Sequence, residues 1–485
     1  MKRGEGPAMH TMQKSLFING EWVKAGQYTE LRSPYSGEAL AEIPAANEEE
    51  TKQAIAAAYA AKAIMAKMPA HRRAAILESL VSLLRERSEE AATIIAQEAA
   101  KPIAVARGEV ARTIETYKFA AEEAKRIHGE TLPLDAAPGG EGRLAYTLRE
   151  PIGVIGAITP FNFPMNLVAH KVGPAIAAGN TIVLKPASQT PLSAFFIAEL
   201  LAEAGLPAGA LNVVTGSGRV VGDLIVTDER VNMVTFTGSP GVGIGIRNRA
   251  GLKRTTLELG SNSAVIIDKG VELEPLIARC ITGAFSFQGQ VCISLQRVYA
   301  HAEVYDAFVE KFVAAAKALR LGSPLDETTD ISALISPGDV QRTLDLIDEA
   351  RRAGATVAAG GRAEGNILQP TVILDAGPSL KVSCQEVFAP IVLVNRVNSV
   401  EEAIERVNDS RFGLQAGIYT ENVHTALDAA EKLHVGGVLI NDIPTFRVDH
   451  MPYGGVKESG TGREGIKYAI EEMTELKLVI WNRRQ

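Results

Sequence analysis

Between Pro151 and Gly260 the sequence alternates short apolar runs with stretches of helical character, and this alternation constrains the fold more than any other feature. The apolar runs are IGVIGAI, TIVLK, LNVVT, VNMVTF and TTLEL, and turn signals separate them from the helical stretches. Strands that alternate with helices form a parallel sheet that is covered on both faces. The pattern predicts a doubly wound α/β domain, whose ligands bind beyond the carboxyl ends of its strands.

The chain of 485 residues is too long for one ordinary core, so at least two domains are expected. Residues 15–44 resemble short strands, with an Asn-Gly hairpin turn at Asn19–Gly20, and residues 48–128 have helical spacing. A second α/β region follows, with helices expected over 271–287, 303–318, 337–353, 400–408 and 422–433. We therefore assign residues 1–128 and 151–260 to one domain and residues 261–451 to another.

Two segments fit neither domain. Residues 129–150 have the pattern of an extended hairpin with a Pro/Gly-rich tip at Pro138–Gly142, and the tail 468–485 ends in the strand-like ELKLVIWN. We expect the tail to pair with the hairpin, within one chain or across subunits, as an oligomerisation arm. A plain surface flap fits the pattern equally well. The arm predicts a homodimer or a homotetramer.

Composition excludes several classes of protein. A hydrophobic content of 46% with 22% charged residues is ordinary for a globular protein, and the net charge of −7 disfavours nucleic-acid or anionic-membrane partners. Three cysteines without a CxxC pair predict neither a disulfide framework nor structural zinc, so no metal is expected. Met1–Lys14 lacks the apolar core of a secretory signal, and no run reaches the ~18 apolar residues of a membrane span. These features together predict a cytoplasmic protein.

Two glycine-rich loops follow predicted strands and are candidates for a dinucleotide site. The loop Gly216–Gly222, GSGRVVG, misses the GxGxxG spacing by one residue, whereas Thr237–Gly243, TGSPGVG, is expected to begin a helix. Free N–H groups and the dipole at a helix N-terminus bind phosphate. Lys185, at the end of TIVLK, could reach a ribose or a phosphate. The alternatives are ordinary turns with glycines and a solvated lysine.

Three further residues have the right types for nucleophilic catalysis. Cys292 lies in FSFQGQVCIS rather than in an apolar run, although a lone cysteine most often only packs. Asn162 lies between prolines in TPFNFP, and a rigid loop suits an amide that must hold an oxyanion. Glu258 ends an apolar strand, where partial desolvation would raise its pKa towards that of a general base. The alternatives are a turn asparagine and an exposed strand-end glutamate.

The motifs TPFNFP, KPASQTP, FTGSPGVG, LELGSNS, FSFQGQVC, EVFAPIV and PYGGVKESGTGREG occur in this order, and together they resemble the NAD(P)-dependent aldehyde dehydrogenase superfamily. The resemblance extends from INGEWV to the C-terminal tail. Phe446–Tyr453 is similar to the lactaldehyde, non-phosphorylating glyceraldehyde-3-phosphate and phosphonoacetaldehyde branches. The resemblance implies two Rossmann-type domains, one for the cofactor and one catalytic, plus a small β arm.

The resemblance also implies roles for individual residues. Cys292 would attack the aldehyde to give a thiohemiacetal, with the Asn162 amide and the Cys292 backbone N–H holding the oxyanion. After hydride transfer to NAD or NADP, Glu258 would activate the water that hydrolyses the thioester, and Lys171 and Glu475 would relay protons. The implied cofactor contacts are Thr159, Pro160, Phe161, Lys185, Ser188, Gly218, Gly222, Phe236, Thr237, Gly238, Ser239, Leu259, Gly260, Glu386 and Phe388.

Two departures from the family pattern bear on specificity. Many NAD-preferring members have Glu where this chain has Ser188, so acceptance of NADP is expected. Val291 stands where members that act on phosphorylated or phosphonate aldehydes have Arg, so an anionic substrate would need another anchor.

Arg447 and His450, with Lys118 or Arg107, are candidates for a weakly cationic pocket that binds a small hydroxylated or anionic aldehyde. Alternatively Arg447 is structural and pairs with a carboxylate such as Asp449. For the whole chain, the alternatives are a CoA-acylating member of the family and a non-catalytic binding or structural protein on the same fold.

Overall fold

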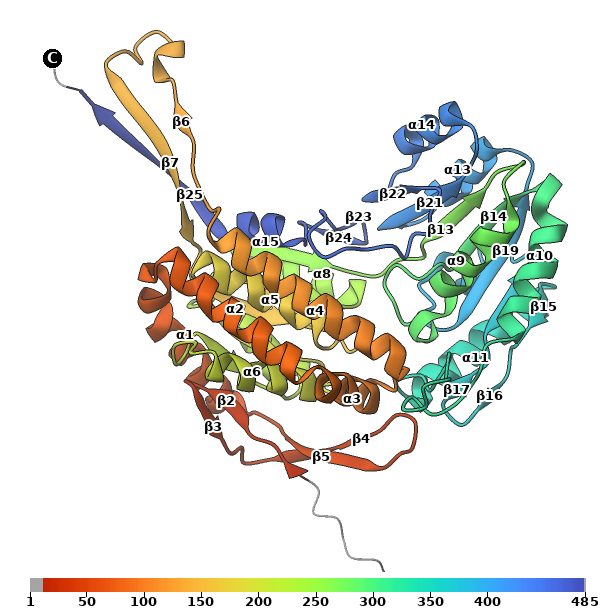
Figure 1. Ribbon diagram of the computed structural model, residues 1–485, viewed down its shortest axis with the longest axis horizontal. Coiled ribbons are helices and arrows are strands. Elements are labelled where there is room, and N and C mark those ends of the chain that lie inside the picture. The colour runs from red at the N-terminus through yellow and green to blue at the C-terminus, as the bar shows by residue number, and fades with distance from the viewer. Residues whose placement is uncertain (1–11, 484–485) are drawn as a thin grey trace, which may run out of the picture.

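The computed structural model describes residues 12–483, so most of the Met1–Lys14 segment, together with residues 484–485, lies outside the described residues. Two large sheets, each covered by helices, and a projecting arm make up the molecule (Figure 1). The two sheets confirm the α/β prediction. Within residues 12–483, no helix combines the length and the apolar character that crossing a membrane requires.

The first sheet has eight strands, and its five central strands are the predicted parallel ones. In spatial order the strands are β24 (Gly460–Thr461), β12 (Arg254–Glu258), β11 (Met233–Thr237), β8 (Val154–Ile158), β9 (Thr181–Lys185), β10 (Leu211–Val213), β2 (Leu16–Ile18) and β3 (Glu21–Val23). Strands β12 to β10 run parallel, and the flanking strands β24, β2 and β3 pair antiparallel.

Alternate side chains of these strands enter two different cores, because successive residues of a strand point to opposite faces. On β8, Ile155 and Ala157 pack with the helices of one face, and Val154 packs with those of the other. The first face is covered by α2 (Ala70–Glu86), α3 (Ser88–Ala99), α4 (Ile103–Ala124), α5 (Asn166–Ala178) and α6 (Leu192–Glu203). The second face is covered by α1 (Glu48–Lys67), α7 (Asp223–Thr227) and α8 (Pro240–Arg249).

The second sheet has seven strands, which are parallel except for β15. Their order is β15 (Thr356–Ala359), β18 (Thr371–Leu374), β19 (Ile391–Val397), β14 (Arg297–His301), β13 (Ala264–Ile267), β21 (Gln415–Tyr419) and β22 (Gly437–Ile440). The helices of this region are α9 (Leu273–Phe285), α10 (Ala302–Lys317), α11 (Pro337–Arg352), α12 (Lys381–Cys384), α13 (Val400–Asn408) and α14 (Val423–Lys432). Five of these six helices lie where the sequence predicts them, and the short α12 was not predicted.

The arm consists of β6 (Thr131–Leu132), β7 (Arg143–Pro151) and β25 (Thr474–Asn482), and it extends away from both sheets (Figure 1). Strand β25 pairs antiparallel with β7 along its whole length within one chain. The predicted tail is too long at its start, because α15 (Ile466–Glu472) buries Ile466, Ala469 and Ile470 at helical spacing. The exposed side chains Leu476, Leu478 and Ile480 alternate along β25 and therefore share one face.

The remaining elements are short. They are β1 (Met12–Gln13), β4 (Tyr28–Arg32), β5 (Ala39–Pro44), β16 (Ala363–Glu364), β17 (Ile367–Leu368), β20 (Phe412–Gly413), β23 (Val456–Lys457) and the single turns Leu134–Ala136, Gly218–Gly222 and Ser286–Gly289.

Candidate active site

A cavity of about 350 Å³ lies at the carboxyl ends of β11 and β12, which is the edge that the sequence predicts for ligands. Helix α4 and the loop before α5 form one side of it, and the Cys292 segment and the 443–453 loop form the other. Its polar lining comprises Glu109, Arg112, Asn162, Asn166, Thr237, Glu258, Arg279, Cys292, Thr445, Arg447 and Glu464. Val105, Phe163, Leu167, Leu259, Val291, Ile293, Ile443, Phe446 and Tyr453 supply apolar walls.

The backbone before Cys292 has an unusual conformation that places the cysteine on the cavity wall. Phe287, Gln288 and Gly289 have φ values of 48°, 55° and 68°, so three successive residues lie in the left-handed region. At Gly289 a Cβ would lie 2.3 Å from the Ala389 carbonyl oxygen, so only glycine fits there. The Gln288 side chain donates to the carbonyls of Ala100 (3.0 Å) and Ala333 (2.8 Å), which holds the turn in place. Non-glycine residues keep such a conformation only where the surroundings enforce it.

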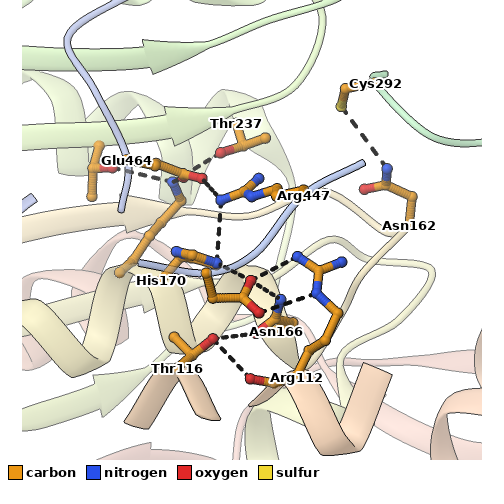
Figure 2. A network of polar contacts seen from close by, with 12 residues as sticks. Arg112, Thr116, Asn162, Asn166, His170, Thr237, Cys292, Arg447 and Glu464 are labelled. Atoms are coloured by element: carbon orange, nitrogen blue, oxygen red, sulfur yellow. Dashed lines mark hydrogen bonds and ion pairs between the residues drawn. The ribbon is translucent and has the colours of Figure 1, made fainter. Parts of the chain in front are cut away.

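Asn162 lies beside Cys292, on the loop between β8 and α5 (Figure 2). Its Nδ2 is 4.0 Å from the Cys292 Sγ and donates to the Gln290 carbonyl at 3.0 Å. An amide nitrogen has two N–H groups. One is engaged by Gln290, and the other is directed at the Cys292 sulfur, next to which an oxygen atom would form.

The thiol of Cys292 is protonated in this state. Burial raises its pKa to about 12, and the nearby carboxylates of Glu386 and Glu258 add to the shift. The Glu386 carboxylate accepts the Ser261 backbone N–H at 3.0 Å, and burial raises its own pKa to about 7. Formation of the thiolate, which is the nucleophilic form, therefore needs a base or a positive charge to enter the site.

Glu258, the last residue of β12, has a buried carboxyl group without hydrogen-bond partners in the described chain. Only 3% of the residue is exposed, and neither carboxylate oxygen has a hydrogen-bond partner among residues 12–483. Burial raises its pKa well above the usual value, and repulsion from Glu464 adds to this shift. The raised pKa agrees with the expectation from the flanking leucines, and a raised pKa makes a carboxylate a stronger base.

Lys171, on α5, is paired with Glu464 rather than with Glu475. Its Nζ lies 3.2 Å from Glu464 Oε1 and donates to the hydroxyls of Thr237 (2.8 Å) and Thr235 (3.1 Å). The expected partner Glu475 lies on the exposed strand β25 and pairs with Arg254 at 3.1 Å. The assignment of Glu475 to the relay is therefore wrong, because a strand of the projecting arm cannot reach the buried Lys171.

Arg447 is the second cation on Glu464. Its Nη2 donates to Glu464 Oε2 at 2.9 Å, and its guanidinium lies 3.7 Å from the centre of the Tyr453 ring. Burial alone would raise the pKa of Glu464, but Lys171 and Arg447 together lower it to about 2. Arg447 therefore pairs with a carboxylate, as its structural alternative expects, but the partner within residues 12–483 is Glu464 rather than Asp449.

Asp449 instead pairs with Arg112 of α4. Figure 2 labels Arg112 and draws its ion pair as dashed lines. Arg112 Nη2 and Nε donate to the carboxylate at 2.6 and 3.1 Å, while Asn166 Nδ2 donates to it at 3.1 Å. His170 Nε2 also lies 2.8 Å from Asp449 and 3.2 Å from Arg447 Nη2, and burial lowers the pKa of His170. Arg112 Nη1 makes no hydrogen bond within residues 12–483, and Arg112 lines the cavity.

The candidate cofactor residues lie at the same sheet edge. Ser239 caps α8, whose N-terminus follows β11, and the Gly218–Gly222 turn follows β10. Lys185 ends β9 and is buried, and its only hydrogen bond within the described chain is to the Pro186 carbonyl at 3.3 Å. Glu386 packs against Gly260, and Phe388 packs edge-to-face on Phe161. Among residues 12–483, no group of three or more His, Cys, Asp and Glu side chains is arranged to hold a metal ion.

Three of the four proposed substrate cations do not line the cavity. Arg107 pairs with Glu89 and Glu327 on the surface, Lys118 pairs with Glu115, and His450 packs on Phe119 with ring centres 4.7 Å apart. Arg107 and Lys118 were misplaced because helical phase decides which side of α4 faces inward, whereas His450 lies on a loop and packs on the outer side of that helix. Arg112, which the sequence analysis missed, is on the inner face together with Gly108 and Glu109. Glu464 was also missed, although it lies in the GTGREG motif.

Comparison with known proteins identifies the class. A model described as the aldehyde dehydrogenase family matches residues 22–479, so this chain belongs to that family of NAD(P)-dependent enzymes. It is 46% identical over 470 residues to 3-sulfolactaldehyde dehydrogenase from Priestia aryabhattai, covering 97% of this chain and 98% of the relative. It is 42% identical over 471 residues to a lactaldehyde dehydrogenase from Methanococcus aeolicus, and the match covers 96% of this chain and 100% of the relative.

Solved structures agree with the fold. Aldehyde dehydrogenase 21 from Physcomitrella patens, in complex with the reaction product succinate, matches with a TM-score of 0.96 and 40% identity over 98% of this chain and 99% of that chain. Glyceraldehyde-3-phosphate dehydrogenase GapN from Methanocaldococcus jannaschii, complexed with NADP, matches with a TM-score of 0.91 and 41% identity over 94% of this chain and 100% of that chain.

Replacing Glu464 by Gln leaves Lys171 and Arg447 buried without a carboxylate and should lower the free energy of unfolding by about 3 kcal/mol. The same substitution at the exposed Glu475 should cost about 0.5 kcal/mol or less. Urea unfolding measures both.

Because the pKa of folded Glu464 is about 2, below the ordinary value of 4.5, the contribution of its ion pairs to stability is complete above pH 4.5. The difference between wild type and E464Q should therefore shrink as the pH falls from 4.5 towards 2, and equal losses for the two variants would contradict the assignment.

Proposed function

We propose that this enzyme oxidises a small aldehyde with an anionic end to the carboxylate, through a thioester on Cys292 that water hydrolyses. The observation that supports this best is the composition of one cavity. A thiol, an amide with a free N–H beside it, and a buried glutamate with no hydrogen-bond partner in the described chain all line it. These are the groups that acyl transfer needs: a nucleophile, an oxyanion donor and a general base.

The chain's own residues take the following roles in the proposal. The Cys292 thiol loses its proton to water, its sulfur forms a bond to the aldehyde carbon as the C=O π bond opens, and the second N–H of Asn162 stabilises the oxygen as it becomes negative. A nicotinamide cofactor held near Lys185 and Ser239 would supply the acceptor for the hydride of that carbon, and the acyl group would then remain on Cys292 as a thioester. Glu258 then removes a proton from water while the water oxygen attacks the thioester, and the C–S bond breaks to release the carboxylic acid and the Cys292 thiolate.

Lys171 is the proposed relay for the proton that Glu258 takes up. Lys171 donates to Thr237, which lines the cavity, and is paired with Glu464 on its other side. Because Glu258 forms no hydrogen bond within the described chain, the relay requires a bridging water. Glu464 stays ionised because two cations are paired with it, whereas the pKa of Glu258 is raised.

We assign the cofactor site to the first sheet, in the domain formed by 1–128 and 151–260, and the catalytic cysteine to the domain 261–451. The N-terminus of α8 offers backbone N–H groups to a diphosphate. Lys185 is buried at the strand edge and forms no ion pair within the described chain, while residue 188 is serine rather than a carboxylate. A site with an ammonium group and no acid accommodates a 2′-phosphate, so NADP fits as well as NAD.

The anchor for an anionic substrate is Arg112, with Arg447 adding positive charge. Arg112 has a free Nη1 at the cavity, which replaces the arginine that this family can place at position 291. Sulfolactaldehyde has a sulfonate, and the succinate bound in the moss enzyme has a distal carboxylate. A cavity of about 350 Å³ has room for an aldehyde of this size. We therefore expect 3-sulfolactaldehyde and succinic semialdehyde to be better substrates than neutral lactaldehyde.

The arm is the proposed subunit contact. Leu476, Leu478 and Ile480 form an exposed apolar row on β25, and the outer side chains of β7, Leu144 and Leu148, are exposed as well. A projecting apolar strand that is left uncovered favours association, and a second copy of the arm would cover it. The proposed assembly is a homodimer or a homotetramer.

The proposed compartment is the cytoplasm. Cys280, Cys292 and Cys384 are free thiols, which suits a reducing environment.

Glu258→Gln should separate the two half-reactions. The variant should still form about one equivalent of NAD(P)H per subunit in a rapid burst, while steady-state turnover falls by about 100-fold or more because the thioester is no longer hydrolysed. In the wild type, kcat should rise with pH through the raised pKa of Glu258, since the ionised form is the base. Turnover that requires added coenzyme A would support the CoA-acylating alternative, and loss of the burst in E258Q would contradict the assigned role.

Ser188→Glu should change cofactor choice. The new carboxylate would repel a 2′-phosphate, so kcat/KM for NADP should fall at least about tenfold relative to that for NAD. The control Ser188→Gln introduces a side chain of the same size as glutamate without its charge. It should leave the ratio of kcat/KM for NADP to kcat/KM for NAD within about threefold of the wild-type ratio. Cofactor titration at fixed aldehyde concentration measures both, and strict use of NAD by the wild type would contradict the proposal.

Arg112→Met should discriminate between substrates. Loss of the ion pair should lower kcat/KM for 3-sulfolactaldehyde or succinic semialdehyde by about 30-fold or more, the equivalent of at least ~2 kcal/mol. Lactaldehyde should change by less than about threefold. Arg107→Met, on the same helix but outside the cavity, is the control and should change neither. An equal loss on anionic and neutral aldehydes would show that Arg112 only maintains the structure.

A further inference from the structure

Lys101 is a fully buried lysine between α3 and α4 that the reaction as described does not use. The residue is 0% exposed. Its Nζ forms an ion pair with Glu109 of α4 and donates to the backbone carbonyl of Asn162 at 2.7 Å. The ammonium group therefore binds the main chain of the proposed oxyanion residue.

Glu109 holds the other end of the same loop. While one carboxylate oxygen pairs with Lys101, the other accepts the backbone N–H groups of Met165 (2.9 Å) and Asn166 (3.1 Å), where α5 begins. The ion pair therefore binds the Asn162 loop on both sides of its turn, at the carbonyl of Asn162 and at the N–H groups three and four residues later.

The same cation also contacts the segment that leads to Cys292. The Lys101 Nζ lies 3.8 Å from the centre of the Phe163 ring and 4.2 Å from that of Phe287. Phe163 follows Asn162, and Phe287 belongs to the left-handed turn before the cysteine. Cation–π contacts of this kind strengthen when water is excluded. One ammonium group thus joins the loop of the oxyanion donor to the segment of the nucleophile.

Stability alone does not explain an ion pair at this place. A hydrophobic pair of similar volume would often be as stable or more stable, because two charges lose their hydration on burial. A hydrophobic pair could not, however, form the hydrogen bonds to Asn162, Met165 and Asn166. The charged pair therefore fixes the conformation of the Asn162 loop, which a hydrophobic pair would leave unbound.

We propose that Lys101 and Glu109 are positioning residues that fix the Asn162 amide at its distance from the Cys292 sulfur. The proposal rests on the oxyanion role of Asn162 in the proposed function. Lys101 touches none of the reacting atoms, since it reaches them only through the Asn162 backbone and two aromatic rings. Glu109 is on the cavity wall, but both of its carboxylate oxygens are engaged by Lys101 and by the loop N–H groups. A misplacement of about 1 Å in such a site can slow the chemistry by about 100-fold.

The test is a double-mutant cycle on the acylation step. Lys101→Met should slow the NAD(P)H burst at saturating aldehyde at least about tenfold, with the KM for the cofactor within about threefold of the wild-type value. Asn162→Ala should slow it by about 100-fold or more. The double variant should be no slower than Asn162→Ala, because the lysine acts through the asparagine. Alkylation of Cys292 by iodoacetamide, followed by peptide mass spectrometry, should change less than about threefold in Lys101→Met.

Glu98 supplies a matched control. It is also a fully buried glutamate, and it accepts two backbone N–H groups, those of Leu192 and Ser193, but at the start of α6. Glu109→Gln and Glu98→Gln should both lower the thermal unfolding midpoint, whereas only Glu109→Gln should slow the burst.

Each outcome decides the proposal. Multiplicative effects in the double variant, a burst of wild-type rate in Lys101→Met, or equal slowing by Glu98→Gln would overturn it. If Lys101→Met does not fold, Glu109→Gln takes its place in the cycle, and failure of both to fold would assign the pair a purely structural role. A wild-type burst in Asn162→Ala would instead overturn the oxyanion role in the proposed function.

Discussion

The site depends on an unequal distribution of charge between two buried carboxyls. Glu464 is paired with Lys171 and Arg447, so it stays ionised, whereas Glu258 has no partner in the described chain and its pKa is raised. If the cations were shared between the two carboxyls, neither would have a pKa suited to proton transfer near neutral pH. Environments that push the pKa values of neighbouring groups apart are the usual way in which a site divides acid and base roles.

The parallel sheet makes this arrangement possible. Residues that follow β8, β11 and β12 meet at one edge because the carboxyl ends of parallel strands lie together. Asn162, Thr237 and Glu258 therefore line one cavity although they are far apart in the chain. Helix α4 closes the other side, and its inner face adds both Arg112 and, through Glu109, hydrogen bonds to the end of the Asn162 loop.

Charge pairing leaves little excess charge on the cavity wall, where Arg112, Arg279 and Arg447 stand together with Glu109, Glu258 and Glu464. Arg447 is paired with Glu464, and Arg112 is paired with Asp449, which also accepts from Asn166 and lies beside His170. Each arginine is held rigidly by its carboxylate and still has nitrogen atoms without a protein partner. In the proposed function, such a pocket would hold an anion by orientation rather than by excess charge, which would favour short substrates whose aldehyde must reach Cys292 at a fixed distance.

The sequence by itself determined the α/β class, the two sheets, the arm and the group of Cys292, Asn162 and Glu258, because these follow from local periodicity and from motifs contiguous in the chain. Tertiary structure decided which charged side chains meet. Glu475 was expected beside Lys171 but lies on the arm, and Arg107 and Lys118 lie on outer positions of the helix whose inner face has Arg112. Ion pairs between residues hundreds of positions apart, such as Lys171 with Glu464 or Arg112 with Asp449, depend on helix phase and domain packing. Local sequence does not record these, because the partners are brought together only when the separate elements pack.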